Sequence, residues 1–186
     1  MTLGESIPLL GNWFHLFFIE NEGMAFGISF GANAGKLLLS LLRIAIVGFL
    51  IYYTVKLIRK GKADAVTVTI FSLIVAGALG NILDSAFYGL IFSESTMTSV
   101  ATLFPPEGGY GRFLYGNVVD MFYFQLFLIP EWFPLWGGSY FFPAVFNIAD
   151  SCVTLGLIGL LIFNKRIFTP EPKKVPELPV DKPESL

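Results

Sequence analysis

Three aspartates in this sequence stand within apolar stretches, where a carboxylate is uncommon. Asp150 opens an apolar run that continues to residue 163, about the length that crosses a bilayer. On a helix it would share one face with Asn147, Ser151 and Thr154, because these residues follow the spacing i, i+3, i+4, i+7. A carboxylate on a spanning helix costs several kcal/mol unless it meets a partner or water. We therefore interpret Asp150 as a candidate functional residue; the alternative is that it only caps the helix or bonds to a neighbouring one.

The other two aspartates stand in similar settings. Asp84 ends a second stripe with the same helical spacing, which contains Gly77, Gly80 and Asn81. Small residues let a second helix approach closely, so the amide and the carboxylate would face that helix. Hydrogen bonding between helices explains this stripe as well as ligand contact does. Asp120 ends the segment Gly-Asn-Val-Val-Asp and has apolar residues on both sides, which is unusual for a merely solvated charge.

Paired carboxylates of this kind can catalyse hydrolysis. Two close carboxylates cannot both ionise easily, so they share one proton. The ionised carboxylate can take a proton from water while the protonated one donates to a carbonyl oxygen, as in an aspartic protease. This chemistry needs neither a metal nor a covalent intermediate. Since His15 and Cys152 stand alone in the sequence, we expect no metal and no cofactor.

The composition is that of an integral membrane protein. Of the 186 residues, 54% are hydrophobic and 14% are charged, whereas a soluble domain is about 25% charged. The formal net charge of -2 offers no basic surface, so we expect no nucleic acid partner. The sequence predicts a single membrane domain over residues 1–166 and a proline-rich, disordered cytoplasmic tail over residues 167–186.

The apolar runs predict a mainly α-helical membrane fold with three spanning helices, at about residues 37–58, 66–90 and 145–163. Lysines and arginines cluster between the first two runs and directly after the third, which places both segments in the cytoplasm by the positive-inside rule. All three aspartates then lie near the outer face. The aromatic segment at residues 13–19 predicts an outer β-like segment, and residues 91–144 predict an outer loop or amphipathic region.

Four segments resemble, in order, the motifs of the lipoprotein signal peptidase family, also called signal peptidase II: residues 21–27, 77–84, 116–122 and 146–156. The most specific elements are Gly-x-Val-Val-Asp and Phe-Asn-x-Ala-Asp, and the resemblance covers about residues 10–165. It implies an aspartyl endopeptidase of the bacterial inner membrane, with its active site near the outer (periplasmic) face. Such an enzyme removes signal peptides from prolipoproteins by cleaving before the diacylglyceryl-modified cysteine.

The resemblance also implies roles for single residues. Asp120 and Asp150 would be the catalytic pair. The supporting or substrate-binding residues would be Asn21, Gly23, Phe26, Asn81, Asp84 and Asn147. The implied partners are diacylated prolipoprotein and membrane lipid, and we expect a monomer.

Three features depart from the family pattern. The family has four spans, and Met1 stands where the first outer segment should begin, so the chain either starts from an internal position or works with three spans. Ser85 stands where the family usually has an arginine; we expect Arg112 or Arg43 to replace that cation, and we include Arg112 in the site. The insertion at about residues 91–115 is expected to be either an arm that gates the site or an ornament on the outside.

Two other functions are compatible with intramembrane carboxylates. A small membrane transporter or proton channel could use them as proton sites. It would be expected to show repeats or broken helices, and the sequence shows neither. The other alternative is a non-catalytic, lipid-binding relative with the same fold.

Overall fold

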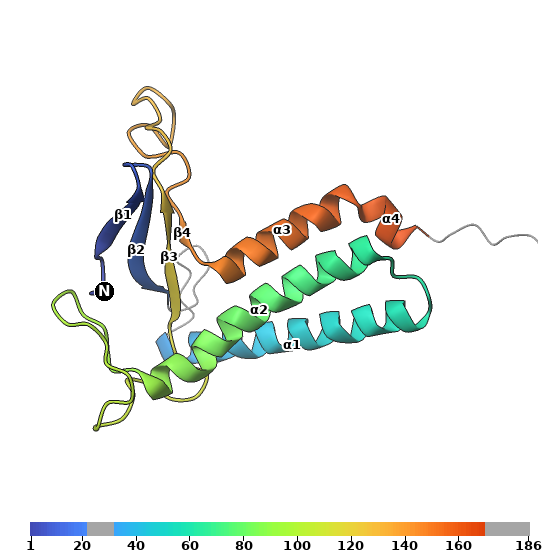
Figure 1. The fold of residues 1–186 in the computed structure, drawn as a ribbon, viewed down its shortest axis with the longest axis horizontal. Coiled ribbons are helices and arrows are strands. Elements are labelled where there is room, and N and C mark those ends of the chain that lie inside the picture. The colour runs from blue at the N-terminus through green and yellow to red at the C-terminus, as the bar shows by residue number, and fades with distance from the viewer. Residues whose placement is uncertain (22–31, 170–186) are drawn as a thin grey trace, which may run out of the picture.

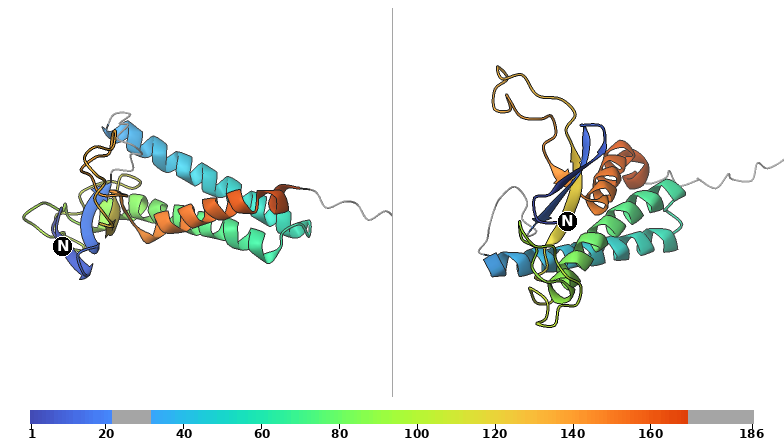
Figure 2. Two further views of the ribbon diagram at one scale, coloured as in Figure 1. Left: turned by 90° about the horizontal axis from the view of Figure 1, so that it is seen from above. Right: turned by 60° about the vertical axis from the view of Figure 1, so that its left-hand side comes forward.

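A β-sheet lies across one end of a helical bundle, with its strands running across the helix axes (Figure 1, Figure 2). The computed structural model describes residues 1–21 and 32–169. The helices are α1 (Ala32–Arg59), α2 (Ala65–Ile91), α3 (Ile148–Ile162) and α4 (Asn164–Phe168). The strands are β1 (Ser6–Leu10), β2 (Phe14–Asn21), β3 (Val118–Phe124) and β4 (Val145–Phe146), paired antiparallel in that order. We call the end of the bundle at the sheet the sheet end, and the end at residues 60–64 the turn end.

Two helices in the described ranges are long and apolar enough to cross a membrane. They are Gly35–Arg59, with 25 residues, and Ala65–Ile91, with 27 residues. Both extend the predicted spans by only a few residues. Many of their large apolar side chains are exposed, including Phe49 at 63% and Leu83 at 54%. Such exposure is expected of helices whose outer faces contact lipid rather than water.

The third predicted span is shorter than expected. Strand β4 occupies part of its first residues, so α3 starts at Ile148 and has 15 residues. At about 1.5 Å per residue this helix is ~22 Å long, whereas the hydrocarbon core of a bilayer is ~30 Å thick. The prediction of three spanning helices is therefore not confirmed. The helix α4 also enters the first residues of the predicted tail, and residues 170–186 lie outside the described ranges.

Helices α2 and α3 pack closely because small residues lie between them. A Cβ atom at Gly77 of α2 would meet the carbonyl oxygen of Ala149 and would lie 2.8 Å from Cγ2 of Val153. In the same way, a Cβ atom at Gly156 of α3 would meet the side chain of Ile74. The glycines therefore set the separation of the two helices. The stripe that contains Gly77 is a helix-packing face.

Aromatic side chains hold the sheet together. The rings of Phe14 in β2 and Phe124 in β3 are stacked with centroids 4.6 Å apart, and Phe124 in turn stacks on Phe146 of β4 at 5.7 Å. On the neighbouring part of the ladder, Ile19 is the partner of Asp120. This pairing brings Asp120 to the junction between the sheet and the bundle.

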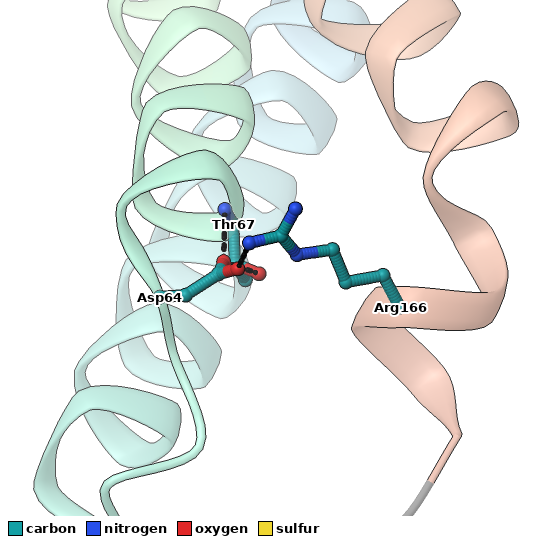
Figure 3. A network of polar contacts seen from close by, with 3 residues as sticks. All are labelled: Asp64, Thr67 and Arg166. Atoms are coloured by element: carbon teal, nitrogen blue, oxygen red, sulfur yellow. Dashed lines mark hydrogen bonds and ion pairs between the residues drawn. The ribbon is translucent and has the colours of Figure 1, made fainter.

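A polar contact closes the turn end of the bundle (Figure 3). Asp64 caps α2: its Oδ1 accepts hydrogen bonds from the backbone N–H of Thr67 at 2.8 Å and from the Thr67 hydroxyl at 2.7 Å. Arg166 of α4 forms an ion pair with the same carboxylate. The Thr67 hydrogen bonds, and then the Arg166 charge, lower the pKa of the Asp64 carboxyl. Because of this contact, the two basic segments lie at the same end of the bundle.

Candidate active site

Asp150 lies in the first turn of α3, where this helix meets the sheet. Its side chain forms a capping box with Asn147: the Asp150 N–H donates to Asn147 Oδ1 at 2.9 Å, and the Asn147 N–H donates to Asp150 Oδ2 at 3.2 Å. Asp150 Oδ1 also accepts a hydrogen bond from Asn81 Nδ2 of α2 at 2.8 Å. Asp150 thus caps its own helix and bonds to the neighbouring one, and both contacts hold the carboxylate in a defined position.

The amide of Asn147 connects the two candidate catalytic aspartates. Its Nδ2 atom lies 2.8 Å from Asp120 Oδ1, 3.1 Å from Asn81 Oδ1 and 3.2 Å from the Val119 carbonyl oxygen. An amide nitrogen carries two N–H groups, so it donates well to two of these acceptors at a time. The shortest contact is the one to Asp120. A continuous chain of hydrogen bonds therefore runs from Asp120 through Asn147 and Asn81 to Asp150.

Asp120 is an enclosed carboxyl group, with 3% of the residue exposed. Burial, followed by the negative charge of Asp150, raises the pKa of Asp120 to about 6. Two neighbouring carboxyl groups do not both ionise easily, so the pair can share one proton. The geometry and the raised pKa are together those of a pair that retains one proton in mildly acidic solution.

Asn21 and Asp84 support Asp120 from two sides. Asn21, at the end of β2, donates from Nδ2 to Asp120 Oδ2 at 3.4 Å. Asp84 of α2 accepts a hydrogen bond at Oδ2 from the N–H of Val119, also at 3.4 Å. The second contact joins α2 to the residue directly before Asp120. Both contacts are suited to positioning Asp120.

The side chain of Arg112 lies away from the aspartates. It is exposed and lines a polar hollow of about 770 Å³, together with Glu20 and Lys36. The groove that contains Asp150 is lined by Arg43 instead. This geometry does not bring Arg112 into the site. Two further predicted site residues, Gly23 and Phe26, lie outside the described ranges.

The insertion at about residues 91–115 is folded back on itself. The N–H of Ser93 donates to the Thr102 carbonyl at 3.0 Å, and the N–H of Phe104 donates to the Ile91 carbonyl at 2.7 Å. In Figure 1 it forms the green loops at the sheet end. The side chain of Phe104 is exposed at 72%, so the arm presents an apolar contact point. Gating by this arm stays a prediction.

An apolar groove of about 520 Å³ leads away from Asp150 between α1, α2 and α3. Its polar lining consists of Arg43, Asn81, Asp150 and Thr154. Its apolar lining consists of Ile46, Leu50, Phe71, Ile74, Ala78, Val153, Leu157 and Leu160. Because Leu160 is close to the last residue of α3, the groove follows most of this helix. Such a groove is suited to bind an extended apolar chain with one end of the chain next to the aspartates.

Asn117 also supports the site, and the sequence did not predict this role. Asn117 accepts a hydrogen bond from Lys36 Nζ of α1 at 3.0 Å and donates from Nδ2 to Glu20 Oε2 of β2 at 2.8 Å. Its backbone N–H donates to the Tyr110 hydroxyl at 2.7 Å. Asn117 therefore joins α1, the sheet and the insertion directly before β3. The sequence feature that could have indicated this role is the position of Asn117 in the segment Gly-Asn-Val-Val-Asp.

The residues suited to hold a metal are few. Within residues 1–21 and 32–169, no group of three or more His, Cys, Asp and Glu side chains is placed to hold a metal ion. The pair of aspartates is instead satisfied by amide donors. That the protein works without a metal stays a prediction.

Replacing Asn147 should separate its two structural roles. Asn147→Ala removes the N-cap of α3 and the amide donor to Asp120, whereas Asn147→Ser keeps a capping oxygen and removes only that donor. The free energy of unfolding of the alanine variant should be about 1 kcal/mol lower than that of the serine variant. In both variants the pKa of Asp120 should rise above about 6, because the hydrogen bond from Asn147 favours the ionised form.

Thermal unfolding and a carbon-13 NMR titration of the aspartate carboxyls would measure these two effects. Equal stability of the two variants would contradict the capping role. An unchanged Asp120 titration would show that the Asn147 amide does not act on this carboxyl.

Comparison with known proteins gives consistent matches over nearly the whole described chain. Residues 1–165 match the family model described as signal peptidase (SPase) II. A protein of Porphyromonas gingivalis named lipoprotein signal peptidase is 51% identical over 166 residues, which are 87% of this chain and 71% of that protein. A protein of the same name from Amoebophilus asiaticus is 38% identical over 175 residues, which are 92% of this chain and 69% of that protein.

The fold is also similar to that of a solved protein. A structure described as a bacterial membrane enzyme superposes with a TM-score of 0.53 at 27% sequence identity. The match covers 87% of this chain and 76% of that one. The sheet across the end of the helices therefore belongs to a fold that is known from a membrane enzyme.

Proposed function

This chain belongs to the signal peptidase II family, whose members remove signal peptides from lipoproteins, and we propose that it does so as an intramembrane aspartyl endopeptidase. The proposed substrate is a diacylated bacterial prolipoprotein, cut directly before its lipid-modified cysteine. The proposed location is the bacterial inner membrane, with the active site near the periplasmic face. The observation that carries the mechanism is the chain of hydrogen bonds that joins Asp120 to Asp150 at the polar end of an apolar groove.

In the proposed reaction the two aspartates have different starting states. Asp120, which is enclosed and has its pKa raised to about 6, holds the proton. Asp150 acts as the general base and takes a proton from a water molecule, whose oxygen attacks the scissile carbonyl carbon. Asp120 donates its proton to the carbonyl oxygen, which forms a neutral tetrahedral intermediate. Asp150 then returns its proton to the leaving nitrogen, and Asp120 is reprotonated as the carbonyl re-forms.

The amides of Asn147 and Asn81 orient the pair during these steps. Each donates to one aspartate, so each favours one position of that carboxyl without carrying charge itself. Asp84 and Asn21 restrain the strand that bears Asp120. Positioning of this kind lowers the entropic cost of reaching the transition state.

The groove along α3 would hold the substrate. Its apolar walls suit the apolar part of a signal peptide or an acyl chain, and its polar end would place one peptide bond at the aspartates. A lipid-modified cysteine next to the scissile bond would enter from the bilayer together with the peptide. Family membership favours this role over a transporter or proton channel.

Cleavage by the purified chain is the experiment that tests the proposal. The chain, in lipid or detergent, is incubated with a diacylated prolipoprotein and with the same protein lacking the lipid. We expect cleavage of the lipidated form only, a product that begins with the modified cysteine by mass spectrometry, and no effect of a chelator. A cut at another bond, or activity that a chelator abolishes and zinc restores, would refute the mechanism. Absence of cleavage would favour a non-catalytic relative.

Cysteine labelling would test the proposed orientation in the membrane. Glu107 is exposed at the sheet end, and Lys62 is exposed at the turn end. In a Cys152→Ala background, Glu107→Cys should react with a membrane-impermeant maleimide added to the periplasmic side, because basic residues keep the turn end in the cytoplasm. Lys62→Cys should react only after the membrane is opened. Reaction of both cysteines from the same side would contradict this topology.

A further inference from the structure

Arg43 is a cation inside the helical bundle. The other basic residues of α1 are Lys36, near its start, and Lys56 and Arg59, in its last turn. The described helices α2 and α3 contain no lysine or arginine. Arg43 is half-buried, although long basic side chains near helix ends normally reach the membrane surface. A charge in this position requires a partner.

The two long helices bring Arg43 to the depth of the aspartate pair. α1 and α2 are antiparallel and are joined by the short turn at residues 60–64. Arg43 and Asn81 are equally far along the chain from the middle of that turn, so they lie at about the same depth. Asn81 donates directly to Asp150. Accordingly, Arg43, Asn81 and Asp150 line the same groove.

The charge of Arg43 can balance the charge of the aspartate pair. An aspartate pair that holds one proton carries one negative charge, and Arg43 carries one positive charge. The Arg43 guanidinium interacts electrostatically with Asp150 and, more weakly, with Asp120. In an apolar groove, each charge alone would be destabilised by the loss of hydration, because no opposite charge would compensate for it. We propose that Arg43 is the resident counter-ion of the aspartate pair and thereby a positioning residue that stabilises the negative charge of the pair.

Other charged groups near the pair are already engaged elsewhere. On α2, Asp84 accepts a hydrogen bond from the N–H of Val119. On β2, Glu20 accepts a hydrogen bond from Asn117, which also binds Lys36 of α1. In the first two turns of α3, the ionisable side chains are those of Asp150 and Cys152. Of these groups, Asp84 also interacts electrostatically with Asp150, and this repulsion between carboxylates makes a nearby cation more favourable.

The counter-ion role explains how the chain works with serine at position 85. Ser85 is 3% exposed, and its carbonyl oxygen accepts a hydrogen bond from the N–H of Gly116 at 2.8 Å. A side chain here is enclosed between α2 and the segment before β3. In the groove that contains Asp150, the cation is Arg43 of α1. The effect on catalysis rests on the proposed aspartyl mechanism, whereas the effect on the charge of the pair does not.

Titration of the Asp120 carboxyl tests the proposal and requires no substrate. The chain contains five aspartates, Asp64, Asp84, Asp120, Asp150 and Asp181, whose carboxyl carbons can be labelled with carbon-13 and assigned through single Asp→Asn variants. Removal of a nearby cation makes ionisation less favourable, so Arg43→Gln should raise the pKa of Asp120 by about half a unit to one unit. Arg43→Lys keeps the charge and should retain most of the wild-type value. Asp64, at the turn end, should titrate as in wild type in both variants and serves as the internal control.

Enzyme kinetics give the second readout. Both limbs of the pH profile of kcat/KM should move to higher pH in Arg43→Gln and return towards wild type in Arg43→Lys. Unchanged Asp120 titration in Arg43→Gln, or identical titrations of the glutamine and lysine variants, would overturn the proposal. A shifted titration in a chain that cleaves no lipoprotein would overturn the proposed function and leave the counter-ion role standing.

A folding defect in Arg43→Gln would also be informative. If this variant does not fold, the double variant Arg43→Gln, Asp150→Asn removes both charges and should fold again, because no uncompensated charge remains in the groove. Recovery of a cooperative thermal transition would support the counter-ion role. Failure of the double variant, while Asp150→Asn alone folds, would mean that Arg43 acts through packing and would overturn the proposal.

Discussion

Replacing Asp120 or Asp150 with asparagine should lower the turnover of a diacylated prolipoprotein by about a thousandfold or more. Asparagine has nearly the same shape, so the hydrogen bonds from Asn147 and Asn81 can be rearranged and the chain should still fold. It cannot take a proton from water or donate one to a carbonyl oxygen as a carboxyl does. Because the two aspartates act as one unit, the double variant should be no slower than the slower single variant.

The matched control for this experiment is Asp64→Asn. Asp64 is an aspartate of the same chain at the turn end, and asparagine can also cap a helix, so this variant should cleave at close to the wild-type rate. Initial rates from separated substrate and product bands are sufficient to measure such differences. Near wild-type turnover in either Asp120→Asn or Asp150→Asn would remove the pair from the mechanism. Additive losses in the double variant would mean that the two residues act in separate steps.

Gly77→Ala should both destabilise the protein and abolish cleavage. The added Cβ atom would meet the backbone of Ala149 and Val153, which cannot move aside as the end of a flexible side chain can. Overpacking of this kind costs about 1–3 kcal/mol. Since α3 must shift to make room, the hydrogen bond of 2.8 Å between Asn81 and Asp150 should also be lost. A reduced melting temperature and loss of turnover are therefore expected together.

Two other glycines provide a graded comparison. A Cβ atom at Gly80 would lie 3.0 Å from the Cβ of Ala149, so Gly80→Ala should have a smaller effect. Among the described residues, a Cβ atom at Gly48 of α1 would meet nothing within 4 Å outside its own helix backbone, so Gly48→Ala should have no destabilising effect and can stabilise the helix. Thermal unfolding in detergent would give the order. A melting temperature of Gly77→Ala equal to that of Gly48→Ala would contradict the close packing of α2 and α3.

The sequence by itself determined the properties that depend on neighbouring residues. Long apolar runs predict α1 and α2 within a few residues, because helix length in a membrane follows from the rise per residue and the bilayer thickness. The spacing of Asn147 and Asp150 predicts a shared helix face, and the structure adds that they cap the same helix. The motifs were also enough to indicate the family.

Only the tertiary structure decided which of these groups meet. Asp120 comes from a strand, and it reaches Asn147 because β3 and β4 pair beside the start of α3. The same pairing shortens the third helix, since residues 145 and 146 extend along β3 instead of continuing the apolar helix. The depth of Arg43 beside Asp150 follows from the antiparallel packing of α1 and α2, which the sequence near Arg43 does not encode. Helix and strand periodicity are set by local backbone geometry, whereas contacts between elements depend on how loops close and how side chains pack.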